Sequence, residues 1–217
     1  MQIIKTFDRL SIKDVASAGG KGASLGEMTQ TGISVPSGFV ILSQVFDAFV
    51  KETDINVESD AILDTVNTDE THTINIASEK IQALILATEM PNDIAEVILR
   101  SFDNLGVKYV AVRSSATSED SSAAAWAGQL DSFLNTTRDM LLEKVKKCWA
   151  SLFTPRAIFY RFEKKLHKSP ISVAVIVQKM VNSEESGIAF SVHPITEDPD
   201  QLIIEAGFGL GEAIVSG

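Results

Sequence analysis

The sequence predicts an α+β domain, because helical and strand patterns occupy different parts of the chain. Apolar residues at helical spacing dominate up to about residue 105 and return over residues 138–166. The last quarter changes to strand patterns, and residues 171–177 are rich in β-branched side chains. A short apolar strand at residues 109–112 separates the two helical parts and leads into a serine-rich segment.

Composition narrows the class of protein. The chain has 217 residues, 45% of them hydrophobic, which is enough for one large domain or two small ones with a real core. Acidic residues outnumber lysine and arginine by 29 to 19, which argues against a nucleic-acid partner. Neither a signal-peptide pattern nor an apolar run of membrane-spanning length is visible, so we expect a cytoplasmic protein with no membrane partner.

The elements can be placed from periodicity and from glycine and proline positions. We expect strands over residues 1–7, 38–41, 109–112, 131–134, 171–181, 187–192 and 201–206, and helices over residues 23–28, 43–50, 74–88, 92–105 and 138–166, the last one broken at Pro155. The strand at 187–192 is expected to pair with 171–181 through a turn at 182–186. Residues 52–73 are expected to form a solvated, partly helical connection. The basic residues of 138–166 are expected on a solvated face, and Cys148 in the core.

A glycine turn at residues 19–22 carries Lys21 and opens a helix. Free backbone N–H groups, the positive helix end and a mobile ammonium would together suit an anion. The spacing is not that of a Walker A motif. A glycine-rich helix entry with a solvated lysine is the alternative, and the turn alone does not separate the two.

The segment after residue 112 begins with Arg113, followed by four hydroxyl side chains within five residues. A planar guanidinium among neutral donors suits an anion with several oxygens, above all a polyphosphate. The chain then returns through Gly128 and Gln129 into a second strand, so the stretch predicts a strand, a phosphate-facing hairpin and a strand. An ordinary serine-rich surface hairpin explains the stretch equally well.

Six blocks of sequence, in this order, closely resemble the nucleotide-binding N-terminal domain of the phosphoenolpyruvate synthase and pyruvate, phosphate dikinase family. The blocks are GGKGASLGEM at residues 19–28, VPSGFVI at 35–41, VRSSATSED at 112–120, AGQLDSFLN at 127–135, VQKMV at 177–181 and EAGFGLGEAIVSG at 205–217. Together they cover nearly the whole chain, and their shared order is far more specific than any single block. The resemblance favours the anion-binding interpretation of both Lys21 and Arg113.

The resemblance implies an ATP-grasp-like fold over residues 1–217, with sub-lobes of about 1–105 and 106–217 and ATP held between two lobes. On that template Lys21 and Arg113 match the lysine and arginine that contact the ATP phosphates, and both would neutralise charge during phosphoryl transfer. The other implied nucleotide contacts are Gly128, Gln129 and Ser132 over the phosphates, Gln178, Met180 and Val181 along the adenine, and Glu205 and Glu212 near the ribose.

The resemblance also implies partners beyond this chain. In the family the magnesium ligands lie after the GLGE block, so we expect no metal ligands here and a domain that is incomplete at its C-terminal end. The phosphohistidine and pyruvate-binding domains are further expected partners in a longer parent chain. His193 is not expected to be the phosphate acceptor, because the family's phosphorylated histidine belongs to that separate domain.

Three functions remain open at this point. The first is the ATP-binding part of an enzyme that phosphorylates pyruvate through a phosphohistidine, with the loop at residues 127–135 favouring the synthase branch over the dikinase branch. The second is the similar ATP module of a rifamycin-type antibiotic phosphotransferase. The third is a nucleotide-binding module without catalysis. Whichever of these holds, we expect the chain alone to be unable to complete phosphoryl transfer.

Overall fold

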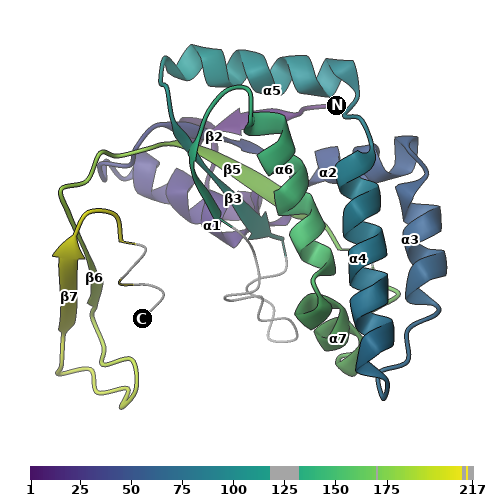
Figure 1. Ribbon diagram of the computed structural model, residues 1–217. Helices are drawn as coiled ribbons and strands as arrows, with labels where there is room; N and C mark the ends of the chain where they lie inside the picture. The colour runs from purple at the N-terminus through teal and green to yellow at the C-terminus, as the bar shows by residue number, and fades with distance from the viewer. Residues whose placement is uncertain (118–131, 170, 212–213, 215–217) are drawn as a thin grey trace. The chain divides into compact units, whose positions relative to one another are not determined.

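The computed structural model describes residues 1–117, 132–169, 171–211 and 214, and the chain forms two compact units, Met1–Met180 and Val181–Gly217 (Figure 1). Helices and antiparallel strands are mixed in the first unit, and the second contains a two-stranded sheet. The predicted α+β class is therefore confirmed.

The first unit is built on a five-stranded sheet with the order β1-β2-β5-β3-β4. Every neighbouring pair in it is antiparallel. The strands are β1 (Ile4–Thr6), β2 (Gly38–Ile41), β3 (Val110–Ala116), β4 (Ser132–Thr136) and β5 (Val173–Lys179). Strands from both ends of the unit thus meet at the centre of one sheet.

Strand β5 lies between β2 and β3 and is buried on both faces. Val175 packs into one hydrophobic core, whereas its neighbour Ile176 packs into another on the opposite face. The prediction that this strand pairs with residues 187–192 was wrong. A continuous apolar run indicates a strand covered on both faces, but it carries no information about which distant strands flank it.

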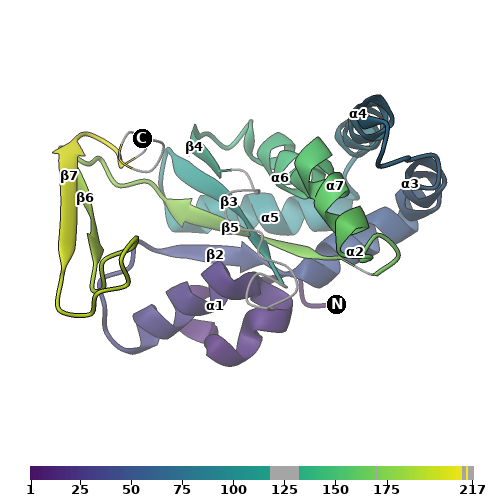
Figure 2. The same ribbon diagram turned by 90° about the horizontal axis from the view of Figure 1, so that it is seen from below.

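Two layers of helices cover the sheet, as Figure 2 shows, with α1 (Val15–Gln30) on one side. The larger core lies on the other side. The helices that contribute to it are α2 (Ser43–Glu52), α3 (Ile55–Leu63), α4 (Thr71–Ala87), α5 (Asn92–Leu105), α6 (Leu141–Ala150) and α7 (Pro155–Glu163). Of three short 3-10 turns, η1 (Phe7–Arg9) and η2 (Ile12–Asp14) lie between β1 and α1, and η3 (Ser151–Phe153) lies between α6 and α7.

Several helix boundaries follow directly from local sequence. Helix α5 has the bounds predicted for it, buries Ile94, Ile98 and Phe102 along one face, and ends at Gly106, whose φ is 61°. The predicted break at Pro155 is confirmed, since α7 begins there with its first turn capped by the Thr154 side chain. These signals lie within one or two turns of the boundary that they set.

Other expectations need correction. Residues 52–73 contain α3, which confirms that this connection is partly helical. The expectation that it is solvated was wrong for one face of α3, because Ile55, Ser59 and Leu63 are buried there. The basic residues of 138–166 are not all solvated either, because Arg161 on α7 is only 5% exposed. Cys148 is fully buried, which confirms the predicted core position.

The second unit contains β6 (Glu185–Phe190) and β7 (Ile203–Phe208), paired antiparallel with Ile188 opposite Glu205. Within the described residues, these two strands pair only with each other and form a two-stranded sheet. Large apolar side chains in this unit remain exposed, among them Ile204 at 70% and Phe208 at 89%.

Candidate functional site

Helix α1 is interrupted at Gly19, and the interruption brings it close to strand β3. Gly19 has φ 69° and ψ 167°, a conformation that is essentially restricted to glycine. A Cβ at this position would lie 2.2 Å from the Ser115 Oγ and 2.5 Å from the Ser115 carbonyl oxygen. Glycine is therefore required here both by backbone conformation and by contact, and the helix restarts with Lys21 in its first turn.

Two hydrogen bonds join this restart to β3. The Gly22 N–H donates to the Ser115 Oγ at 3.3 Å, so a serine 93 positions away caps the helix. The Lys21 Nζ donates to the Ser114 carbonyl oxygen at 3.4 Å. The positive end of the restarted helix and a half-buried ammonium thus lie against the end of β3.

A second anchor holds the amino-terminal end of α1. Ser11 and Asp14 form a capping box, and the Lys5 Nζ lies 2.7 Å from the Asp14 Oδ1. The hydrogen bond from Lys5 lowers the pKa of the Asp14 carboxyl, and hydrogen bonds from Ser11 act in the same direction against desolvation. Both ends of the segment that precedes Lys21 are therefore fixed.

Arg113 lies within β3 and not in a loop, because the strand continues through Ala116. The expectation that a loop begins after residue 112 was wrong. Ser114 and Ser115 are 1% and 0% exposed, and their small side chains allow the strand to continue between packed layers. Hydroxyl-rich sequence was interpreted as a loop, although here it marks a strand approached closely by a helix.

The strand register decides what lies beside Arg113. Ser115 faces α1, and side chains alternate along a strand, so Arg113 lies on the same face. Arg113 is paired with Ser132 on β4 and with Ile176 on β5. The two predicted strands are confirmed as the antiparallel β3–β4 pair, whereas the phosphate-facing hairpin between them stays a prediction. The residues that connect the two strands are outside the described ones.

Gln178 reaches the same face from β5. It is paired with Ala111, two residues before Arg113, and its Nε2 donates to the Pro36 carbonyl oxygen at 3.1 Å. The backbone N–H of the nearby Met180 donates to the Tyr109 carbonyl oxygen at 3.2 Å. A lysine, an arginine, a hydroxyl and an amide from four elements therefore share the α1 face of the sheet. They are Lys21, Arg113, Ser132 and Gln178.

The remaining predicted residues are not brought to this face by any described contact. Gly128, Gln129 and Glu212 lie outside the described residues. Val181 and Glu205 belong to the second unit, where Glu205 is exposed on β7.

Two further observations concern residues with other possible roles. The half-buried His193 accepts hydrogen bonds through Nδ1 from the Ile195 and Thr196 N–H groups. The described residues contain no group of three or more His, Cys, Asp or Glu that could hold a metal ion. Within the same residues, the helices are too short or too polar to cross a membrane.

Sequence reasoning missed the roles of Gly19 and Ser115. Gly19 was assigned to a turn, and Ser115 was one of several generic donors. The available signal was the cluster of Gly19, Gly20 and Gly22, since glycine adopts positive φ and allows another backbone to come close. The distance of 93 residues between Gly22 and its acceptor left no local trace.

Cations, a hydroxyl and an amide on one face of the sheet are the kinds of group that pair with the oxygens of a polyanion. The comparison with family models identifies the family to which this domain belongs. The chain belongs to the family of pyruvate phosphate dikinase AMP/ATP-binding domains, whose model matches residues 15–217.

Curated relatives are similar over the same region. A probable phosphoenolpyruvate synthase of Methanothermobacter thermautotrophicus is 43% identical over the whole of this chain and 33% of its own length. One from Archaeoglobus fulgidus is 47% identical over 94% of this chain and 28% of its own length. The phosphoenolpyruvate synthase of Pyrococcus furiosus is 38% identical over the whole chain and 31% of its own length. The chain thus spans at most a third of these relatives.

Proposed function

We propose that this chain is the ATP-binding part of a phosphoenolpyruvate synthase-like phosphotransferase, which uses ATP to phosphorylate pyruvate through a phosphohistidine on another domain. The family match and the names of the relatives support the proposal. The much greater length of those relatives leaves room for phosphohistidine and pyruvate-binding domains in a parent chain.

The observation that carries the proposal is the docking of the α1 restart onto β3. It gives Lys21 and Arg113 the same face of the sheet, although 92 positions separate them in sequence. Two cations next to a helix start can neutralise the oxygens of a triphosphate and the charge that develops during phosphoryl transfer. Ser132 opposite Arg113 would add a neutral donor.

The remaining roles are proposed with it. Gly128 and Gln129 would cover the phosphates, and Gln178, Met180 and Val181 would line the adenine. Glu205 and Glu212 would lie near the ribose. The two-lobed ATP-grasp arrangement, with sub-lobes of residues 1–105 and 106–217, belongs to this proposal. So does magnesium bound to the ATP phosphates and held by residues of a longer parent chain.

Calorimetric titration with ATP and magnesium tests the phosphate roles. Lys21→Ala and Arg113→Ala are each expected to weaken binding about tenfold or more, or at least about 1.4 kcal/mol, through loss of a charge-assisted contact. The matched controls are the exposed Lys13→Ala and Arg100→Ala, which should leave affinity within about twofold of the parent chain.

Inorganic triphosphate separates the phosphate role from the adenine role. Lys21→Ala and Arg113→Ala should weaken triphosphate and ATP alike, whereas Gln178→Ala should weaken ATP alone. Circular dichroism establishes that each variant is folded. Folded Lys21 and Arg113 variants that bind ATP as tightly as the parent chain would rule the proposed site out.

A further inference from the structure

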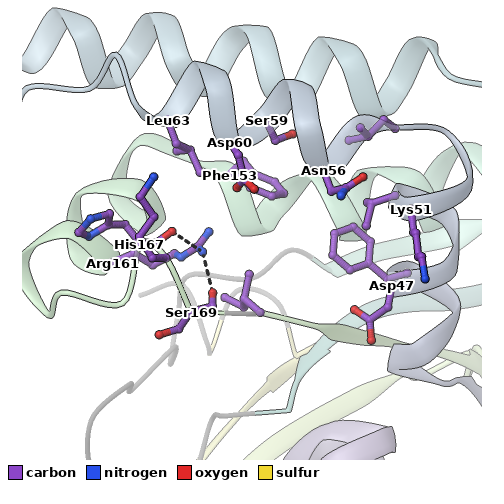
Figure 3. Close-up of a pocket in the computed structure, with 15 residues that line it drawn as sticks. Asp47, Lys51, Asn56, Ser59, Asp60, Leu63, Phe153, Arg161, His167 and Ser169 are labelled. Atoms are coloured by element: carbon purple, nitrogen blue, oxygen red, sulfur yellow. Dashed lines mark hydrogen bonds between the residues drawn. The ribbon is translucent and has the colours of Figure 1, made fainter.

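A second concave site lies on the opposite side of the sheet from α1. It is a cavity of about 480 Å³ between α2, α3 and the segment that leads from α7 into β5 (Figure 3). Its walls include Phe46, Ile55 and Leu63, which belong to the core on the side away from α1. The cavity is therefore separated by the sheet from the face that carries Lys21 and Arg113, and its volume is that of a small-molecule site.

Arg161 lines one side of this cavity, together with His167 and Ser169, as Figure 3 shows. Its side chain comes from α7 and is buried, and its Nη2 donates to the carbonyl oxygens of His167 at 3.4 Å and Ser169 at 3.2 Å. A guanidinium has five N–H donors, and these two bonds use one nitrogen. Within the described residues, Nε and Nη1 have no hydrogen-bond partner.

Arg161 also lacks a carboxylate at ion-pair distance within the described part of the chain. Burial lowers the pKa of Arg161, and the more distant charge of Asp60 acts in the opposite direction. An arginine remains charged at all physiological pH values, so a buried charge is held here without a direct counter-ion. Residues that serve only to stabilise a fold rarely leave a charge in this state, because it costs stability.

Two other buried polar atoms at the cavity wall are also unsatisfied. Neither the Ser59 Oγ nor the His167 Nδ1 has a hydrogen-bond partner among the described residues. The His167 ring is fixed by stacking on Phe162, with ring centroids 4.4 Å apart and planes 7° from parallel. An unpaired buried polar atom lowers the stability of the fold. The two unpaired atoms show that polar groups around the cavity are incompletely satisfied, and Arg161 is the group whose remaining N–H donors suit an oxygen-rich ligand.

Two of the other charged residues at the cavity, Asp47 and Lys168, are already engaged by neighbours, and Arg161 is the buried cation of the lining. The Asp47 carboxylate accepts a hydrogen bond from the Ser172 hydroxyl at 2.5 Å, and Lys168 forms an ion pair with Asp64. Lys51, Asn56 and Asp60 are further polar residues of the wall. The rest of the wall is apolar. It is formed by Phe46, Val50, Ile55, Leu63, Phe153 and Ile171. The site thus combines one buried cation with an apolar surface.

We propose that this cavity binds a small carboxylic acid with an apolar body, whose carboxylate accepts hydrogen bonds from Arg161. The planar guanidinium fork matches a carboxylate in geometry and charge. The apolar body packs against the side chains of α2, α3 and η3. The site is independent of the nucleotide site, so its test does not depend on ATP binding.

Titration of the 15N-labelled chain with 4-phenylbutyrate, followed by NMR, tests the proposal. The expected result is saturable movement of the backbone signals of Ser59, His167 and Ser169. The uncharged amide of the same acid has the same apolar body and should bind at least about tenfold more weakly, since it lacks the charge-assisted contact. Equal binding of acid and amide, or movement only at other residues, would overturn the proposal.

Two variants localise the effect. Arg161→Gln should weaken 4-phenylbutyrate binding about tenfold or more and leave binding of the amide unchanged. Because Arg161 also holds two backbone carbonyls, this variant is accompanied by Asn56→Trp, at an exposed position on the cavity wall. The added indole fills the cavity without removing a core contact and should abolish binding. Saturable binding that survives in a folded Asn56→Trp chain would contradict the site.

Discussion

Strands β5 and β7 have similar apolar sequences and very different surroundings. Val173–Val177 of β5 is fully buried between two strands and two helical layers. In β7 Ile204 and Phe208 are largely exposed, and the described partner of the strand is β6 alone. An apolar run therefore predicts a strand, but its burial depends on what packs against the sheet. Residues 1–180 contain such packing, whereas a two-stranded sheet gains little stability by itself.

The largest loss of stability on substitution is expected at a core aromatic side chain of the first unit. Trp149 is fully buried, and its ring lies 4.9 Å from that of Phe49 and 5.9 Å from that of Phe46. Trp149→Ala should lower the free energy of unfolding by about 3–5 kcal/mol, through lost burial and a residual cavity. Urea unfolding followed by circular dichroism measures it. A loss below about 1 kcal/mol would show that the core is far looser than its packing indicates.

The next largest difference in stability is expected between two glycines with positive φ, one in each unit. Gly19→Ala should cost roughly 2–4 kcal/mol, because the new Cβ is strained by the backbone and collides with Ser115. Gly209 in the second unit also has positive φ, 78°, but nothing lies within 4 Å of a Cβ there. Gly209→Ala should therefore cost only about 1 kcal/mol of backbone strain. Equal losses in thermal unfolding would mean that the approach of α1 to β3 is not tight.

The free energy of unfolding of the first unit is expected to depend on pH through Asp14. The folded-state pKa of Asp14 is lowered, so its ion pair with Lys5 stabilises the fold above the ordinary aspartate value of 3.8. That stabilisation is lost as the pH falls through the lower folded-state pKa. Lys5→Gln should reduce stability by about 0.5–1 kcal/mol at pH 7 and by less at pH 3. The exposed Lys13→Gln serves as control, and a deficit that does not change with pH would contradict the assignment.

The smallest effect is expected at the exposed apolar surface of the second unit. Phe208→Ser should change the free energy of unfolding by less than about 0.5 kcal/mol, because its side chain is already in water. The same measurement as for Trp149→Ala makes the two values directly comparable. A loss of several kcal/mol would show that Phe208 is buried in solution and that the contrast between the units is wrong.

Local signals predicted much of the fold. The apolar face of α5, the Gly106 stop and the break at Pro155 are each encoded within a few residues, and all three were found as predicted. The partners of β5 could not be predicted in this way. Its neighbours β2 and β3 begin at residues 38 and 110, and a strand buried on both faces has no polar side to reveal its register.

The candidate site was predictable in its residue types but not in its geometry. Lys21 and Arg113 were recognisable from glycine and serine context, and six blocks pointed to one family. Arg113 was nevertheless placed in a loop, because hydroxyl side chains usually favour turns. The same serines fit a buried strand here, since Gly19 removes the side chain that would otherwise collide with Ser115. Whether such a serine-rich segment forms a strand or a loop depends on how well it packs against a segment far away in the sequence.

The hydrogen bond from Gly22 to Ser115 has a consequence for biosynthesis. The ribosome delivers α1 long before the serine that caps its restart, which follows 93 residues later. Until β3 has emerged and paired, the N–H groups after Gly19 have only water as a partner, and a helix start without a cap frays. The nascent chain therefore acquires a fixed position for Lys21 only after β3 has been translated, since the acceptor Ser115 follows Gly22 by 93 residues. An amino-terminal element is thus completed among the later steps of folding.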